Sequence, residues 1–184
     1  DVCASPGGKC SFIAEKTNNK LLINAFDIHS NRIKLLKETI NRLDIKSVTI
    51  SKKDASCDSF PISNKMLIDV PCTGTGVMSK RADLRWRRKH FHLNELVEIQ
   101  KKILENMSKY IEIGGEIIYS TCSLEKEENW DVIDDFLSKK NNFKFISSKN
   151  FVPSIFLDER GALSTFPSIH KIDGVFGVKL KRIL

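Results

Sequence analysis

The chain has 184 residues, of which 41% are hydrophobic, and it carries a formal net charge of +7. This length suffices for one α/β domain with a full core, and no apolar run approaches the length of a membrane-spanning helix, so we expect no membrane partner. The basic balance favours an anionic partner, and nucleic acid is the usual one.

Short apolar runs alternate with amphipathic stretches along the chain. Strands alternating with helices predict an α/β fold with a mostly parallel sheet and helices on both faces, in which ligands bind beyond the carboxyl ends of the strands. The predicted strands are 21–27, 48–51, 65–70, 116–121, 143–147 and 175–182, and the predicted helices are 9–17, 29–43, 93–111 and 124–140.

The first candidate site is a glycine-containing turn, Ser5–Lys9, that precedes a predicted helix. Two glycines allow a tight turn and a close approach to a ligand, although such a turn alone is weak evidence. Asp27 ends the next strand, where an acid can accept hydrogen bonds from ribose hydroxyls, and Asp54 follows the predicted strand 48–51. The combination favours a nucleoside-containing cofactor, while a helix-entry role for Asp27 and a solvent-facing role for Asp54 stay open.

Two of the five cysteines, Cys72 and Cys122, directly follow predicted strands. Both would open onto the edge of the sheet where ligands bind, and Asp69 lies just before the first of them. A single cysteine is more often a core residue, but the pair with an acid favours chemistry. Ser123 is predicted to cap the helix after Cys122, and a helix N-terminus favours the thiolate form of a nearby cysteine.

No CxxC pair and no zinc-ligand spacing is present, so we expect no metal site. An odd number of cysteines without an export signal predicts reduced thiols and an intracellular protein, with cytoplasm, nucleolus and organelle all open. Because the chain opens inside the first motif, we expect residues 1–184 to be a fragment that lacks a first strand.

Four segments resemble, in order, motifs of the RNA 5-methylcytosine methyltransferases, the Sun/NSUN family, and the pattern is most similar to its bacterial 16S rRNA members. The segments are Asp-Val-Cys-Ala-Ser-Pro-Gly-Gly-Lys at 1–9, Asp-Val-Pro-Cys-Thr-Gly-Thr-Gly at 69–76, Ser-Thr-Cys-Ser at 120–123 and Asp-Gly-Val-Phe at 173–176. Two departures are Cys10, where the family commonly has Thr, and Arg81-Ala82, where a His-Pro usually precedes the acid.

The resemblance implies the Rossmann-like class I methyltransferase fold, a seven-stranded sheet with its last strand antiparallel. It implies S-adenosylmethionine as cofactor, with S-adenosylhomocysteine as the product. The residues that match the family's cofactor contacts are Cys3, Ala4, Ser5, Pro6, Gly7, Gly8, Lys9, Asp27, Asp54 and Asp69.

Carbon 5 of cytosine is a poor nucleophile, and addition of a thiolate to carbon 6 activates it for methyl transfer. An acid at ring nitrogen 3 would ease the addition. Residue types alone leave both cysteines as candidate nucleophiles. The resemblance implies that Cys122 attacks, that Cys72 assists product release and that Asp69 contacts the target cytosine.

A basic segment follows the first cysteine motif and contains Trp86. Basic side chains with an aromatic residue among them suit phosphate contacts and base stacking, although a solvated loop with Trp86 in the core is the plain alternative. The predicted RNA-binding residues are Lys80, Arg81, Arg85, Arg87 and Arg88.

We therefore expect a monomeric RNA (cytosine-5)-methyltransferase acting on ribosomal RNA or transfer RNA. The resemblance also implies an additional N-terminal RNA-binding region, which is missing from residues 1–184. Two alternatives are kept: a catalytically silent methyltransferase-like RNA-binding module, and a DNA cytosine-5 methyltransferase. Intact Cys72, Cys122 and Asp69 disfavour the first. The Thr121–Ser123 segment and the absence of a large target-recognition insert disfavour the second.

Replacing Arg85 and Arg88 together with alanine should weaken RNA binding and reduce its dependence on salt. The variant would neutralise fewer phosphates, so fewer counterions would be released when RNA binds. Binding measured over a series of salt concentrations checks this. Unchanged affinity and slope would assign the segment to structure alone.

Overall fold

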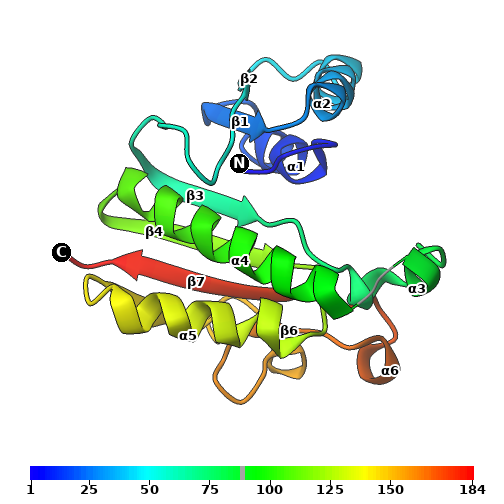
Figure 1. Ribbon diagram of the computed structural model, residues 1–184. Coiled ribbons are helices and arrows are strands. Elements are labelled where there is room, and N and C mark those ends of the chain that lie inside the picture. The colour runs from blue at the N-terminus through cyan, green and yellow to red at the C-terminus, as the bar shows by residue number, and fades with distance from the viewer. Residues whose placement is uncertain (88–89) are drawn as a thin grey trace. The chain divides into compact units, whose positions relative to one another are not determined.

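The computed structural model describes residues 1–87 and 90–184, and for residues 85, 87, 90 and 91 it describes the backbone only. The chain forms two compact units, unit 1 (Asp1–Ser59) and unit 2 (Phe60–Leu184) (Figure 1). Unit 1 contains α1 (Gly8–Lys16), β1 (Ile23–Asp27), α2 (Ser30–Arg42) and β2 (Val48–Lys52).

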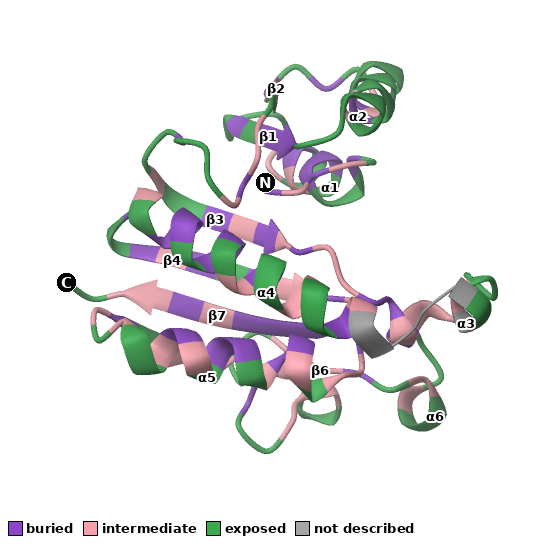
Figure 2. Cartoon of the chain, viewed as in Figure 1, coloured by how far each residue is buried: buried purple, intermediate pink, exposed green. Residues whose placement is uncertain are grey.

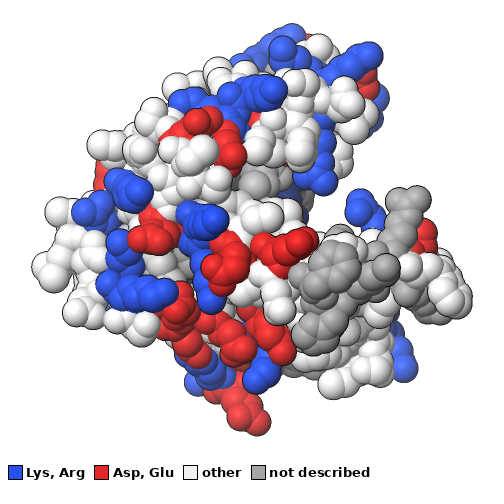
Figure 3. Space-filling model, in the orientation of Figure 1, with Lys and Arg blue, Asp and Glu red and all other residues white. Residues whose placement is uncertain are grey.

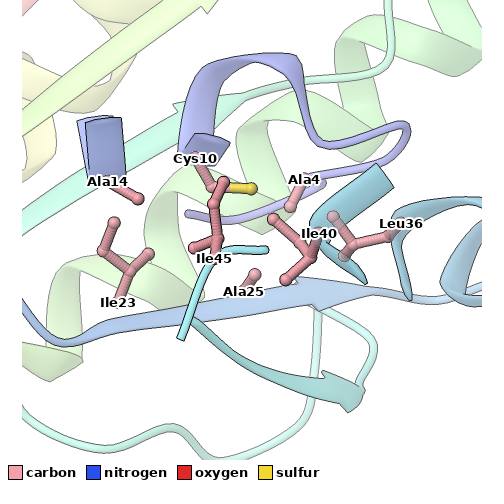
Figure 4. Packing of buried hydrophobic residues seen from close by; sticks show 8 residues of the cluster. All are labelled: Ala4, Cys10, Ala14, Ile23, Ala25, Leu36, Ile40 and Ile45. Carbon is pink, nitrogen blue, oxygen red and sulfur yellow. The ribbon is translucent and has the colours of Figure 1, made fainter. Parts of the chain in front are cut away.

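In unit 1, β1 and β2 form a parallel pair, and the chain start adds a short bridge to β1. Figure 4 shows the apolar side chains that α1, α2 and β1 bury together. Cys10 belongs to this cluster: it is fully buried, and its thiol donates a hydrogen bond to the carbonyl of Gly7. The cysteine at this family position is therefore a core residue.

Unit 2 contains the remaining strands and helices. The strands are β3 (Ser63–Asp69), β4 (Ile111–Thr121), β5 (Phe143–Ile146), β6 (Leu163–Ser164) and β7 (Phe176–Arg182). The α-helices are α3 (Leu84–Arg87), α4 (His90–Met107), α5 (Trp130–Lys139) and α6 (Pro167–His170), and the 3-10 turns are η1 (Thr75–Val77), η2 (Ser108–Tyr110), η3 (Lys126–Glu128) and η4 (Ser154–Phe156).

The five strands of unit 2 form one mixed sheet. β3 pairs with β4 in parallel, β7 lies between β4 and β5 and is antiparallel to both, and β6 pairs with β7. Helices α4 and α5 lie side by side along the sheet (Figure 1). Buried residues line β7 (Figure 2), which fits its central place in the sheet. The antiparallel last strand is as expected.

The predicted strands and the helices of unit 1 are confirmed to within a few residues, but the seven-stranded sheet is not. Strand hydrogen bonds in the described residues form a two-stranded and a five-stranded sheet. A continuous seven-stranded sheet with helices on both faces stays a prediction. No described helix combines the length and apolar character needed to cross a membrane.

The predicted helix 93–111 ends too late. The α-helix stops at Met107, and Ile111 already begins β4. Ile111 keeps the helical spacing of Leu104 and Met107, so apolar periodicity alone could not locate the end of the helix.

Gly114 and Gly115 lie inside β4, where the register against β3 shifts. Gly114 has a φ of 82°, and a Cβ on Gly115 would meet a β3 carbonyl at 2.9 Å.

The core of unit 1 gives a stability prediction. Leu36 is fully buried in the cluster, whereas its neighbour Leu35 is 50% exposed. Leu36→Ala should lower the free energy of unfolding of unit 1 by about 2–5 kcal/mol, because it deletes buried methyl groups and leaves a cavity. Leu35→Ala is the matched control, with an expected change within about 0.5 kcal/mol. Urea unfolding followed by circular dichroism measures both, and equal losses would contradict this packing.

Candidate active site

The parallel register of β3 and β4 brings the two predicted catalytic cysteines together. Asp69 pairs with Ser120 at the ends of the strands, so the loops that follow leave the sheet side by side. The Sγ atoms of Cys72 and Cys122 are 3.2 Å apart, and the backbone N–H of Cys122 donates to the sulfur of Cys72 over 3.4 Å. This Sγ–Sγ distance fits a hydrogen bond between thiol groups and exceeds the roughly 2.05 Å of a disulfide bond.

Asp69 lies at the same edge of the sheet. The hydroxyl of Ser120 donates to its Oδ1 atom over 2.7 Å, which fixes the carboxyl group beside the end of β4. Asp69, Cys72 and Cys122 are all partly exposed. The structure thus brings together, at one accessible edge, the three residues that were predicted to be catalytic.

The two cysteines differ in their surroundings. The hydrogen bond to Cys122 and burial together raise the pKa of Cys72, and the negative charge of an ionised Cys122 or of Glu128 raises it further. The N–H group of Cys122 acts in the opposite direction, but it is outweighed. Cys72 therefore keeps its proton longer than an ordinary thiol does, and it can donate that proton in a hydrogen bond to its neighbour.

The predicted helix directly after Cys122 is wrong. Residues 126–128 form a 3-10 turn, and α5 begins only at Trp130. Ser123 does not cap a helix; its hydroxyl accepts the backbone N–H of Glu125, a local turn that competes with helix formation. The helix-terminus argument for a Cys122 thiolate therefore does not hold, and the paired thiol of Cys72 takes its place.

Hydroxyl side chains tie the two cysteine loops to each other. The hydroxyls of Thr73 and Ser123 are 3.1 Å apart, and Thr75 accepts the backbone N–H of Leu124 over 2.9 Å. The N–H of Gly76 donates to the carbonyl of Cys122 over 2.9 Å. These contacts hold both loops in one arrangement.

The Asp173-Gly174 turn braces the first loop from the other side. The N–H of Gly174 donates to the carbonyl of Gly76 over 2.8 Å, and a Cβ on Gly76 would lie 2.2 Å from the carbonyl oxygen of Gly174. Only glycine fits at such a distance. Phe176, which follows this turn, is buried against Trp130 and therefore belongs to the core.

In unit 1, the predicted cofactor loop wraps around the end of β1. The carboxylate of Asp27 is buried and accepts backbone N–H groups from Ser5 at 3.4 Å and from His29 at 3.1 Å. Gly7 has a φ of 106°, and its missing Cβ would approach Leu36 to 2.8 Å, so glycine is required there. Beside Gly8 the space is open, which leaves room for a ligand at the start of α1.

Two further acids of unit 1 behave differently from each other. Asp54 caps a local turn: its Oδ1 atom accepts from the N–H and hydroxyl of Ser56, and these hydrogen bonds lower its pKa. Asp1 was not predicted. Both of its carboxylate oxygens are buried, and within the described residues neither accepts a hydrogen bond. Such an acceptor suits a ligand that brings a donor.

The predicted RNA-binding segment is described in part. Arg88 lies outside the described residues, and Arg85 and Arg87 belong to α3, of which only their backbone is described. Lys80 forms an ion pair with Asp173 at 2.6 Å. Trp86 is 88% exposed, which excludes the alternative that it packs in the core.

Arg81, the last of the predicted RNA-binding residues, is exposed. The face of unit 2 that carries α4 and α5 shows Lys and Arg interspersed with Asp and Glu (Figure 3). That mixture is no continuous basic surface, so the prediction of RNA contacts continues to rest on the segment 80–88. Among the described residues, no group of His, Cys, Asp or Glu is arranged to hold a metal ion.

The sequence reading missed a buried polar group behind the cysteines. Glu128 and Gln100 are both fully buried, and Gln100 donates to Glu128 over 2.9 Å. Gln100 lies next to Ile99, which is 42% exposed, so on this helix the polar residue is buried and its apolar neighbour is not. Glu128 is the fifth residue of the predicted helix 124–140, where an acid is interpreted as a charge near the helix start, so the only available signal was its nearness to Cys122.

Comparison with known proteins decides the family. The model of the family described as 16S rRNA methyltransferase RsmB/F matches residues 1–181. The chain belongs to this family. The resemblance seen in the four sequence motifs is thereby confirmed.

Relatives and solved structures agree with this membership. The chain is 30% identical to the "Probable ribosomal RNA small subunit methyltransferase B" of Bacillus subtilis, over 99% of the chain and 42% of that protein. It is 31% identical to the "25S rRNA (cytosine-C(5))-methyltransferase nop2" of Schizosaccharomyces pombe, over 100% of the chain and 33% of that protein. The crystal structure of NSun6 from Pyrococcus horikoshii with SFG superposes with a TM-score of 0.88 and 31% identity, over 100% of the chain and 47% of the other.

The RsmB/F chain thus spans less than half the length of these relatives. The chain and the NSun6 structure share the fold of the class I methyltransferases, with an α/β architecture and a mixed sheet.

The short distance between Cys72 and Cys122 gives a prediction that needs no substrate. Diamide, a two-electron oxidant, should join their sulfurs in a disulfide while it is itself reduced to the hydrazine, because the thiols already lie 3.2 Å apart. Peptide mapping by mass spectrometry should find the 72–122 link, reversible by dithiothreitol, and no such link in Cys72→Ser. A dominant link through the exposed Cys57 would contradict this geometry.

Proposed function

We propose that this chain is the catalytic part of an RNA (cytosine-5)-methyltransferase. It transfers a methyl group from S-adenosylmethionine to carbon 5 of a cytosine, through a covalent bond between Cys122 and carbon 6. The observation that carries the proposal is the pair of thiols at 3.2 Å at one edge of the sheet, with Asp69 beside them.

The names of the relatives support the reaction and the substrate class. The fission yeast relative is named as an rRNA cytosine-C5 methyltransferase, and the bacterial one as a ribosomal RNA small subunit methyltransferase. We therefore propose ribosomal RNA as the substrate, with transfer RNA as the second choice. A catalytically silent module would have no need for both thiols and the acid, so the intact set favours the enzyme.

The residues of unit 1 fit S-adenosylmethionine. The cofactor presents ribose hydroxyls and an ammonium group as donors, and unit 1 offers the carboxylates of Asp27 and Asp1 as acceptors. The open space beside Gly8 would admit it. A relative's structure solved with SFG, an S-adenosylmethionine analogue, supports the same choice. When bound, the cofactor supplies an electrophilic methyl group.

Cys122 is the better nucleophile of the pair. The pKa of Cys72 is raised, first by its hydrogen bond to Cys122 and then by burial, and we therefore assign the attack to Cys122. The Cys122 thiolate adds to carbon 6, and the electrons of the carbon 5–carbon 6 double bond shift through the ring to nitrogen 3. There the carboxylic acid form of Asp69 donates a hydrogen bond that stabilises them. Carbon 5 then takes the methyl group.

Product release reverses the addition. Cys72, as its thiolate, removes the proton from carbon 5, the double bond forms again, and the Cys122 thiolate leaves. The target base has to stand outside a helix during these steps, because thiol and methyl donor approach its faces. The exposed ring of Trp86 offers a surface on which a neighbouring base could stack.

A trapping experiment tests the roles of the cysteines. In the full-length protein, Cys72→Ser should leave enzyme joined to its RNA, because addition and methyl transfer proceed but release fails. With ribosomal RNA as substrate, a band of retarded protein should survive denaturing electrophoresis and disappear after nuclease treatment. Cys122→Ser should give no such band.

The exposed Cys57 provides the matched control, since Cys57→Ser should behave as the unaltered protein does. A stable adduct with Cys122→Ser and none with Cys72→Ser would exchange the roles. Adducts on duplex DNA and none on RNA would favour the DNA enzyme instead.

A further inference from the structure

Glu128 is an ionisable group for which the proposed reaction has no use, and it lies directly behind the cysteines. It is fully buried, and within the described residues no Lys or Arg forms an ion pair with it. The acids that precede it closely in the sequence, Glu125 and Glu127, are only partly buried. Burying a carboxylate costs several kcal/mol unless other groups satisfy it, so its place calls for an explanation.

Hydrogen-bond donors surround this carboxylate. The backbone N–H of Thr73 donates to both of its oxygens, at 2.9 and 3.2 Å, the hydroxyl of Thr73 donates to Oε2, and the amide of Gln100 donates to Oε1 at 2.9 Å. In each of these contacts the carboxyl group of Glu128 is the acceptor. The donors are neutral, so they stabilise the negative charge without cancelling it.

The same bonds hold the loop that carries Cys72. Glu128 fixes Thr73 on one side of the cysteine, and Gln100 donates to the carbonyl of Pro71 on the other side over 2.9 Å. Tyr119, itself fully buried, donates to the backbone carbonyl of Glu128 over 2.7 Å. Cys72 is therefore held in a fixed position next to a fixed negative charge.

We propose that Glu128 is a positioning residue that separates the roles of the two cysteines by keeping the proton on Cys72 while Cys122 acts as the thiolate. The inference rests on the proposed function for its meaning, but it concerns a property of Cys72 that can be measured without RNA or cofactor.

The electrostatic argument has a definite sign. Hydrogen bonding to Cys122, burial and the charge of Cys122 raise the pKa of Cys72, and Glu128 adds to this as a nearby negative charge. Cys122 and Glu128 are two titratable groups that act on Cys72. Tyr119 behind them remains neutral, because burial, with the charges of Glu128 and Cys72, raises its pKa as well.

The effects of Cys122 and Glu128 on the pKa of Cys72 persist through different stages of the proposed reaction. Once Cys122 has bonded to carbon 6, its sulfur carries no negative charge and no longer accepts the proton of Cys72. The influence of Cys122 then disappears, whereas that of Glu128 stays. Cys72 thus becomes able to ionise at the stage when a base is needed, and Glu128 keeps it a strong base for the proton on carbon 5.

Alkylation of Cys72 tests this directly. In the full-length protein with Cys122→Ser, iodoacetamide modifies Cys72 at a rate that follows its thiolate fraction, and mass spectrometry of the peptide reports the rate at each pH. Adding Glu128→Gln should speed the modification at neutral pH by roughly threefold or more and move its pH profile down, since the charge is lost.

Two controls separate charge from packing. Glu127→Gln makes the same chemical change one residue away, and it should leave the profile of Cys72 unchanged. Glu128→Asp keeps the charge while it loosens the hydrogen bonds, and its profile should stay close to that of Cys122→Ser alone. An unchanged profile in Glu128→Gln, or an equal acceleration in Glu128→Asp, overturns the proposal.

Should Glu128→Gln fail to fold, Thr73→Val provides the opposite test. It removes one donor from the carboxylate and leaves the charge less compensated, so modification of Cys72 should slow; acceleration overturns the proposal. Methyl transfer to ribosomal RNA, measured separately, tests the proposed function. A shifted profile without methyl transfer would leave the inference standing and the proposed function refuted.

Discussion

The parallel pairing of β3 and β4 is the constraint on which the site depends. Because Asp69 pairs with Ser120, the chain emerges from both strands at the same level, and Cys72 and Cys122 meet two or three residues later. A shift of the register by one residue would turn the side chains at the strand ends to the opposite face of the sheet. The backbone hydrogen bonds between β3 and β4 thus bring the two thiols close to each other.

Polar contacts behind the sheet edge turn this register into a defined geometry. Thr73, Ser123 and Glu128 form a buried hydrogen-bonded network in which each polar group finds a partner. Such a network costs desolvation energy and contributes less to stability than an apolar core of equal volume would. In return, it allows one arrangement of the two loops, which a reaction between atoms in fixed positions requires.

Much of this could be predicted from the sequence, for identifiable reasons. The strands ending at Asp27 and Asp69 can be predicted because each is an apolar run that stops at an acid. The site residues can be predicted as well, because the ends of parallel strands lie at one edge of a sheet. The turn after Cys122 could not be predicted, since Ser123 suits a helix cap and a local turn equally well. The burial of Glu128 could not be predicted because its partners Thr73 and Gln100 are distant in sequence, and burial of an acid depends on such partners.

The backbone contact between Gly76 and Gly174 has a consequence for sequence variation. Neither residue has a side chain to shorten, so a larger residue at one position cannot be accommodated by a smaller one at the other. A substitution at one of these two positions therefore cannot be compensated by a substitution at the other, as is possible for most pairs of side chains in a core. Two positions far apart in sequence are in this way restricted as strictly as neighbours in a tight turn.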